Sequence, residues 1–151
     1  MMFCYQCQET AGNTGCTVMG VCGKNPEVSN LQDLLIYVLK GISHVVVKER
    51  MDVESLREAN FETINSLFMT ITNANFDADA IEKQIRKMLN IRDELVKSAS
   101  SENLHDAAVF SVDTRQSMLE KAAAVGVLST EDEDVRSLRE LITYGLKGMA
   151  A

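Results

Sequence analysis

The sequence predicts an all-α protein in which an N-terminal cysteine-rich loop wrap is followed by a three-helix bundle and part of a second helical bundle. Three observations predict this fold. Ala, Leu, Glu, Lys and Met are plentiful, which favours helices over strands. From Ser29 onward apolar residues recur at helical spacing. All four cysteines and the single proline instead lie within the first 26 residues, which lack this spacing.

Residues 1–28 form the first predicted unit. They hold four of the eight glycines, at positions 12, 15, 20 and 23. Glycine-rich sequence without a sustained period of 3.6 residues is typical of irregular structure. We therefore expect a segment that wraps around a ligand.

Residues 29–98 are expected to form the three-helix bundle, with helices near 29–47, 53–72 and 77–98. Ser29 and Gln32 have the spacing of a capping box at the start of the first helix. Asp77 is expected to cap the third. The predicted inward positions are Leu31, Leu34, Leu35, Val38, Leu39, Ile42 and Val46, then Leu56, Ile64, Leu67, Phe68 and Ile71, then Ile81, Ile85, Met88, Leu89 and Leu95. Phe61 and Phe76 are also expected in the core.

Residues 107–151 are expected to begin a second, truncated helical bundle. Residues 107–112 suit a short strand, a buried extended link or a helical turn. A fourth helix is predicted to start at Asp113 or Thr114 and to stop near Gly126. A fifth starts at Thr130, which has capping-box spacing to Glu133, and the acidic run 131–134 favours a helix start. Its apolar positions are Val135, Leu138, Leu141, Ile142 and Leu146.

Charge and hydropathy exclude several functional classes. The net charge of −7 argues against a nucleic-acid partner, which would require clustered Lys and Arg. No apolar run approaches the roughly 20 residues that span a bilayer, so no membrane partner is expected. The N-terminus lacks a basic leader and an apolar signal core, which predicts a cytoplasmic location with reduced thiols. No phosphate-binding loop, dinucleotide fingerprint or nucleophile–His pair is present, and no catalytic residue is predicted.

The four cysteines are the candidate metal ligands, at Cys4, Cys7, Cys16 and Cys22. Four thiolates so close in sequence can surround one compact centre, and the glycines between them let backbone N–H groups approach the sulfurs. This spacing predicts an iron–sulfur cluster. A structural zinc site remains an alternative, although such sites more often contain two C-x2-C pairs. A disulfide framework does not suit a helical chain without a secretion signal.

Other side chains near the cysteines have less specific interpretations. Lys24 either offsets the charge of a cluster or is simply exposed. An apolar cover is expected from Phe3, Tyr5, Val18, Met19 and Val21. Both histidines suit structural or surface roles better than metal binding: His44 is expected to be packed or at the surface, and His105 to be solvated.

The cysteine segment also closely resembles the hybrid cluster proteins, also called prismane proteins or hydroxylamine reductases. The resemblance lies in three stretches, Met2-Phe3-Cys4-Tyr5-Gln6-Cys7-Gln8-Glu9-Thr10-Ala11, Gly15-Cys16-Thr17 and Gly20-Val21-Cys22-Gly23-Lys24. Residues 30–36 and 141–148 also resemble the family, whose members are several times longer than this chain.

The resemblance implies more than the spacing does. It implies that the four cysteines hold one 4Fe–4S cluster, with 2Fe–2S as the alternative. That cluster would pass electrons to a hybrid iron–sulfur–oxygen cluster where hydroxylamine is reduced to ammonia and water, and nitric oxide reduction and a role in nitrosative stress are also attributed to the family. No cysteine follows Cys22, so this chain cannot supply the cysteine ligands of the hybrid cluster.

We therefore expect the N-terminal electron-transfer part of a hydroxylamine reductase. Its partners would be a redox donor protein and the remainder of the same polypeptide, and the chain by itself should be inactive. Two alternatives stay open: a zinc-stapled helical interaction module and an autonomous ferredoxin-like carrier.

Overall fold

The computed structural model describes residues 1–100 and 102–151. Within these residues the chain folds into α-helices and short 3-10 helices, and its only β-type pairing is an isolated bridge between Cys4 and Cys16. The α-helices are α1 (Pro26–Lys48), α2 (Arg57–Met69), α3 (Ala78–Lys97), α4 (Asp106–Val109), α5 (Arg115–Val125) and α6 (Glu133–Ala150), and the 3-10 helices are η1 (Ala11–Asn13), η2 (Val53–Leu56) and η3 (Val127–Ser129). The predicted all-α fold is confirmed.

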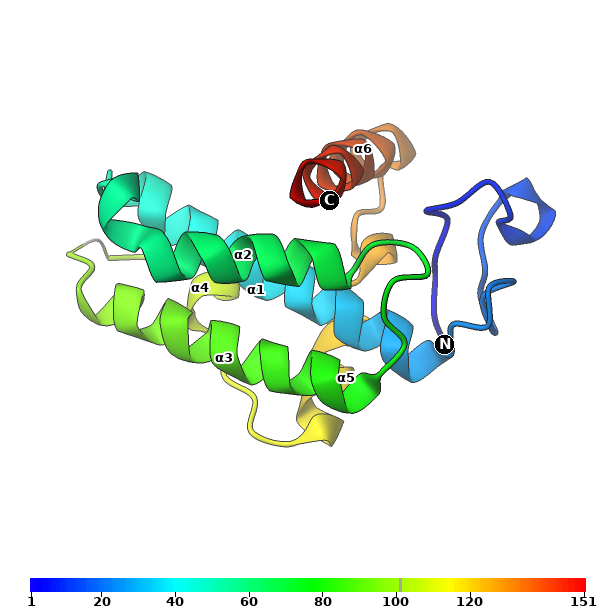
Figure 1. Ribbon diagram of the computed structural model, residues 1–151, viewed down its shortest axis with the longest axis horizontal. Helices are drawn as coiled ribbons and strands as arrows, with labels where there is room; N and C mark the ends of the chain where they lie inside the picture. Colours follow the sequence, from blue (N-terminus) through cyan, green and yellow to red (C-terminus); the bar gives the residue numbers. More distant parts are fainter. Residues whose placement is uncertain (101) are drawn as a thin grey trace.

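Helix α1 lies at the centre of the molecule and contacts α2, α3, α4 and α5 (Figure 1). Its apolar face and that of α3 form one core, which Phe110, Met118 and Ala122 complete from the α4–α5 region. The three predicted helices of the bundle are present, but the packing of α4 and α5 on α1 was not foreseen. The proposed division of the chain at residues 28, 98 and 107 stays a prediction.

The start of α1 differs from the sequence prediction. The helix begins at Pro26, and Asn25 is its N-cap: the Asn25 side chain accepts a hydrogen bond from Val28 N at 2.8 Å. Proline suits the first turn of a helix because the amide it lacks would have no partner there. Ser29 is instead buried one turn inside the helix.

Helix α2 packs with its polar side inward. Its buried residues are Ala59, Glu62 and Ser66, and Gln84 of α3 donates to the Glu62 carboxylate and to Ser66 Oγ, both at 3.0 Å. The predicted core positions Phe61, Ile64, Phe68 and Phe76 are all exposed, Phe61 by 62%. The prediction for these four was wrong. For Phe61, Ile64 and Phe68 the reason is that the polar network holds the opposite face of α2 against α3, whereas Phe76 lies in the connection between the two helices.

Helix α3 follows the sequence prediction, with Asp77 as its N-cap and Ile81, Ile85, Met88 and Leu89 in the core. Arg92 was not foreseen. Its guanidinium is buried under the α4 turn, where it donates to the carbonyl oxygens of Ala107 at 3.3 Å and Phe110 at 2.6 Å. The segment forms a helical turn only as far as Val109 and continues without regular structure over residues 110–112, so it combines two of the three forms expected.

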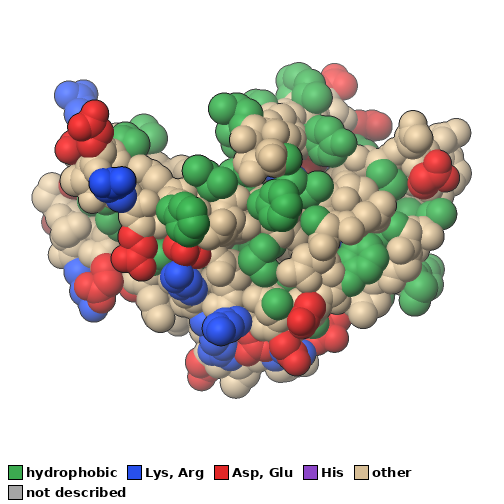
Figure 2. All heavy atoms as spheres, in the orientation of Figure 1, with side chains coloured by type: hydrophobic (Ala, Val, Ile, Leu, Met, Phe, Trp, Pro, Cys, Tyr) green, Lys and Arg blue, Asp and Glu red, His purple; other side chains and the backbone are tan. Residues whose placement is uncertain are grey.

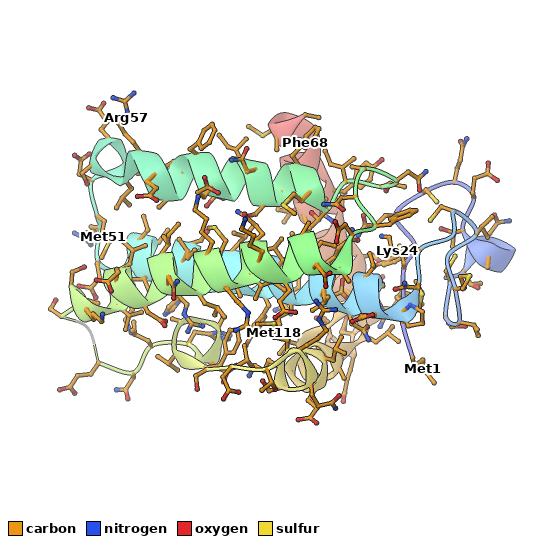
Figure 3. All side chains as sticks on the ribbon, turned by 60° about the horizontal axis from the view of Figure 1, so that its bottom comes forward. Met1, Lys24, Met51, Arg57, Phe68 and Met118 are labelled. Carbon is orange, nitrogen blue, oxygen red and sulfur yellow. The ribbon has the colours of Figure 1, made fainter. Side chains whose placement is uncertain are left out.

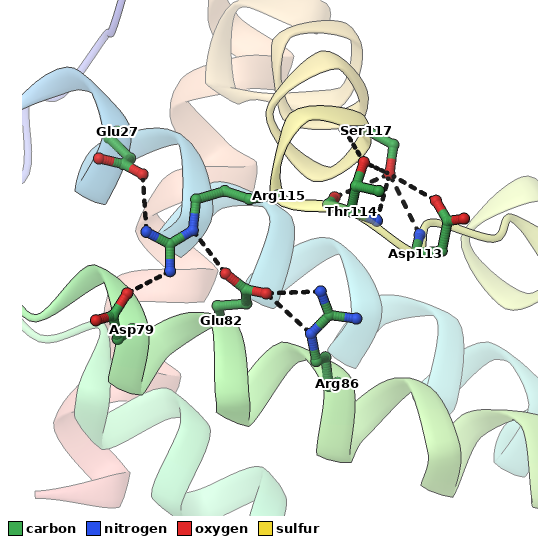
Figure 4. A network of polar contacts seen from close by, with 8 residues as sticks. All are labelled: Glu27, Asp79, Glu82, Arg86, Asp113, Thr114, Arg115 and Ser117. Carbon is green, nitrogen blue, oxygen red and sulfur yellow. Dashed lines mark hydrogen bonds and ion pairs between the residues drawn. The ribbon is translucent and has the colours of Figure 1, made fainter.

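A second polar network joins three helices at the end of the bundle near the start of α1 (Figure 4). Arg115 Nε lies 2.6 Å from Glu82, its Nη1 lies 3.2 Å from Glu27, and its Nη2 pairs with Asp79. Arg115 is the first residue of α5, which Thr114 caps through Ser117 N, and α5 ends at Gly126 as predicted.

Helix α6 crosses α2 and is seen almost end-on in Figure 1. Asp132 caps it by accepting from Val135 N at 2.9 Å, so the predicted cap at Thr130 was wrong. Only Thr143 and Lys147 of α6 are buried. The apolar positions predicted for this helix are all exposed, namely Val135, Leu138, Leu141, Ile142 and Leu146. Figure 2 shows hydrophobic side chains at the surface over α6 and α2. No helix among the described residues is long and apolar enough to cross a membrane.

Candidate metal centre

The cysteine segment forms a loop at one end of the bundle, beside the first turn of α1 (Figure 1). Its two arms pair in antiparallel fashion: Met2 N donates to Thr17 O at 3.3 Å, Cys4 N to Cys16 O at 3.1 Å and Cys16 N to Cys4 O at 2.8 Å. Residues directly opposite each other in such a pair project their side chains from the same face. The pairing therefore places Cys4 and Cys16 side by side although eleven residues separate them in sequence.

Cys7 lies where the first arm ends. The Cys7 carbonyl oxygen accepts from Thr10 Oγ1 at 2.6 Å and from Thr10 N at 3.2 Å. These bonds start the turn that continues into η1, where Gly12 has a φ of 60°. Glycine reaches this left-handed conformation without a steric penalty.

Cys22 projects from a tight turn that leads into α1. Gly23 N donates to Gly20 O at 2.8 Å, and Gly20 N donates to Lys24 O at 2.8 Å. A Cβ atom added at Gly20 would lie 3.0 Å from Cys22 Sγ, and Gly23 has a φ of 91°. Both glycines are therefore needed to hold this sulfur where it is.

Aromatic rings cover one side of the loop. The Phe3 ring lies against Gly15, where an added Cβ would approach ring carbon Cε2 to 2.4 Å, and it contacts the Tyr5 ring at 5.1 Å between centroids. Phe3 and Tyr5 are half-buried. The remaining members of the expected apolar cover, Val18, Met19 and Val21, are exposed, so that part of the prediction was wrong.

Two lysines from opposite ends of the chain are buried beside the loop. Lys24, labelled in Figure 3, is 2% exposed, and its Nζ lies 3.8 Å from Cys4 Sγ. The interpretation of Lys24 as simply exposed was wrong, and its role in offsetting the charge of a cluster stays a prediction. Lys147 of α6 is 4% exposed and donates to Gln6 Oε1 and to Thr70 O, both at 3.2 Å. Lys147 was not predicted as a site residue, although it lies within residues 141–148, which resemble the family, and on the side of α6 opposite the apolar stripe.

Burial shifts the pKa of two groups near these lysines. Desolvation, together with the neighbouring positive charge of Lys24, lowers the pKa of Lys147 to about 8. Desolvation also raises the pKa of the half-buried Asp33 carboxyl to about 7, and the Glu140 carboxylate adds to this rise. A buried polar environment therefore connects the cysteine loop with α1 and α6.

The similarity to known proteins extends over nearly the whole chain. The sequence profile described as the Prismane/CO dehydrogenase family matches residues 2–151. The chain belongs to this family. It is 69% identical over 150 residues to a protein of Acetivibrio thermocellus named hydroxylamine reductase, covering 99% of this chain and 28% of that protein.

Two more distant members of the Prismane/CO dehydrogenase family carry the same name. The protein of Clostridium perfringens is 50% identical over 157 residues, covering 99% of this chain and 29% of the relative. The protein of Desulfovibrio desulfuricans is 49% identical over 152 residues, covering 99% and 28%. The chain thus spans less than a third of the length of these relatives.

The four cysteines of this Prismane-family chain are free thiols, so no disulfide framework forms. Among the described residues, no three His, Cys, Asp or Glu side chains are grouped closely enough to hold a metal ion. The donor set nevertheless suits an iron–sulfur cluster, because four thiolates without competing carboxylates are the ligands such clusters use. That all four cysteines bind one centre stays a prediction.

The histidines lie outside this region and have structural contacts. His105 N donates to His44 Nε2 at 3.3 Å, and His105 Nδ1 accepts from Ala107 N at 3.1 Å. His105 is exposed, as predicted, and its side chain also caps α4. These contacts occupy one ring nitrogen of each histidine.

Proposed function

We propose that Cys4, Cys7, Cys16 and Cys22 bind a single 4Fe–4S cluster and that the chain is the N-terminal electron-transfer domain of a hydroxylamine reductase. The observation that carries this proposal is the pairing of Cys4 with Cys16 beside the buried Lys24 ammonium. A buried cation next to thiols is costly unless a negative charge faces it. An all-cysteine iron–sulfur centre carries such a charge.

Within this proposal each part of the loop has a role. The antiparallel pair supplies two thiolates, and the turns at Thr10 and Gly20 present Cys7 and Cys22. Phe3 and Tyr5 limit access of water on one side. When bound, the cluster supplies one-electron transfer, and the surrounding residues hold the thiolates and balance their charge.

The remaining roles lie outside this chain. The relatives named hydroxylamine reductase extend well beyond the matched region, and this chain has no cysteine after Cys22. We propose that the remainder of the polypeptide carries the hybrid cluster and reduces hydroxylamine, and that a redox donor protein in the cytoplasm supplies electrons. The units 1–28, 29–98 and 107–151 would be the cluster segment, the first bundle and the start of a second bundle.

Anaerobic reconstitution of the 151-residue chain with iron and sulfide tests the assignment. We expect about four iron and four sulfide per chain, with broad visible absorption that bleaches on reduction. Cys7→Ser and Cys16→Ser should each lower the iron content severalfold, because a hard oxygen replaces a soft thiolate. Stoichiometric zinc with no iron, or unchanged iron in both variants, would contradict the proposal.

A second measurement concerns activity. A cluster with four cysteine ligands has no open coordination position for the N–O group. We therefore expect the iron-loaded chain to accept an electron from dithionite without reducing hydroxylamine at a measurable rate. Sustained turnover would contradict the proposed division of labour between this chain and the remainder.

A further inference from the structure

The two lysines beside the cysteine loop contact side chains that lie two residues apart in sequence, those of Cys4 and Gln6. Lys24 Nζ lies 3.8 Å from Cys4 Sγ, and Lys147 Nζ lies 3.2 Å from Oε1 of Gln6, the residue between the first two cysteines. Lys24 directly precedes α1, whereas Lys147 belongs to the last turns of α6. Tertiary packing alone brings them together.

Neither ammonium forms an ion pair with a carboxylate within 4.0 Å among the described residues. Asp33 and Glu140 act on Lys147 only through space, and the positive charge of Lys24 opposes them. The other recorded partners of the two lysines are neutral: a thiol, an amide oxygen and the Thr70 carbonyl oxygen. Two buried cations without a carboxylate in contact favour the binding of another anion nearby.

We infer that Lys147, together with Lys24, is a positioning residue that balances the charge of the cysteine-bound centre and raises its reduction potential. This inference rests on the proposed function. One-electron reduction adds one negative charge to the centre, and no bond is formed or broken. Buried cations stabilise the reduced form more than the oxidised form, because Coulomb energies are large where water is excluded.

Lys147 connects α6 with the cysteine loop. Its ammonium also donates to Thr70 O at the C-terminal end of α2, so it joins α6, α2 and the cysteine loop at one point. A shift of α6 along α2 would withdraw a positive charge from beside Gln6. The reduction potential of the cysteine-bound centre therefore depends on the position of α6 relative to α2.

The test is a spectroscopically monitored redox titration of the iron-loaded 151-residue chain and three variants. Lys147→Met removes the charge and retains much of the side-chain length, whereas Lys147→Arg keeps the charge. Lys97→Met removes a charge from the exposed end of α3, where Lys97 pairs only with Glu94. Iron content, sulfide content and circular dichroism are measured for each variant.

We expect Lys147→Met to lower the ratio of reduced to oxidised centre at least tenfold at a fixed ambient potential, which corresponds to about 59 mV for one electron. Lys147→Arg and Lys97→Met should change this ratio less than threefold. If Lys147→Met prevents iron loading without changing the helical content while Lys147→Arg loads normally, the charge-balancing role is also supported.

Two outcomes would overturn the inference. One is an unchanged potential in an iron-loaded Lys147→Met variant, which would leave the proposed function intact. The other is loss of iron from both Lys147 variants, which would show that the lysine only fills space. Failure of the parent chain itself to bind iron would instead refute the proposed function, so the two failures are distinguishable.

Discussion

The α1–α3 core and the region where α6 meets the cysteine loop are built on different principles. In the core, apolar stripes of α1, α3 and α5 face each other and are fully buried. At the loop, two lysines, two threonines and a cysteine are buried together with Met2, while the large apolar side chains of α6 face outward. Apolar burial stabilises the first region by itself. The second keeps buried charges that apolar packing does not stabilise, and we propose that a bound group compensates them.

The core should respond most strongly to mutation. Ile85→Ala removes a side chain that is 0% exposed and should lower the free energy of unfolding by about 2–5 kcal/mol, because it leaves a cavity. Leu141→Ala on α6, where the side chain is 67% exposed, should change it by less than about 0.5 kcal/mol. Urea denaturation of the 151-residue chain measures both. An equal loss of unfolding free energy in the two variants would contradict the proposed difference between the two regions.

Buried polar contacts in the core should come next. Arg92→Met leaves the Ala107 and Phe110 carbonyl oxygens without their donor, and we expect a loss of about 1.5–3 kcal/mol. Arg86→Met is the matched control, since Arg86 pairs with Glu82 at the surface and should contribute only about 0.3–0.5 kcal/mol. Chemical denaturation distinguishes the two variants, and a larger effect at Arg86 would contradict this ranking.

The contribution of the region near the loop to the free energy of unfolding should depend on pH. Burial raises the pKa of Asp33 to about 7, above its ordinary value of 3.8, so the folded chain holds this proton over a pH range in which the unfolded chain has lost it. This contribution to stability is full below about pH 4 and falls as the pH rises to about 7, by at most about 1.4 kcal/mol per pH unit.

Asp33→Asn should remove this part of the slope in a series of urea denaturations between pH 4 and pH 7.5. The variant curve should therefore run above the parent curve at neutral pH and approach it in acid. Parallel curves for parent and variant would show that Asp33 is not desolvated.

The smallest expected effect concerns the start of α1. Asn25→Ala removes the N-cap bond to Val28 N and should lower the free energy of unfolding by about 1 kcal/mol. Ser29→Ala, at the position that the sequence pattern favoured as the cap, should have a smaller effect because alanine suits a helix interior. Thermal unfolding monitored by circular dichroism would rank the two variants, and the reverse ranking would restore Ser29 as the cap.

Several features could be predicted from the sequence because they depend on neighbours along the chain. Helical spacing identified the apolar faces of α1 and α3, Asp77 was recognised as a cap, Thr114 was one of two residues expected to start α5, and α5 was expected to stop near Gly126. The spacing of the four cysteines identified the candidate centre. In each case the interacting groups lie within a few residues of one another or follow a fixed helical period.

Other features were decided only by the tertiary structure. The exposure of Phe61 and Phe68 follows from the Glu62–Gln84–Ser66 network, which joins two helices and has no signature within either. The burial of Lys147 follows from the crossing of α6 over α2, which brings its ammonium to Gln6 across 141 residues of chain. A sequence pattern shows which face of a helix is apolar. Which face becomes buried depends on the free energy of contacts between distant segments, and here polar and charged contacts outweighed the apolar stripe.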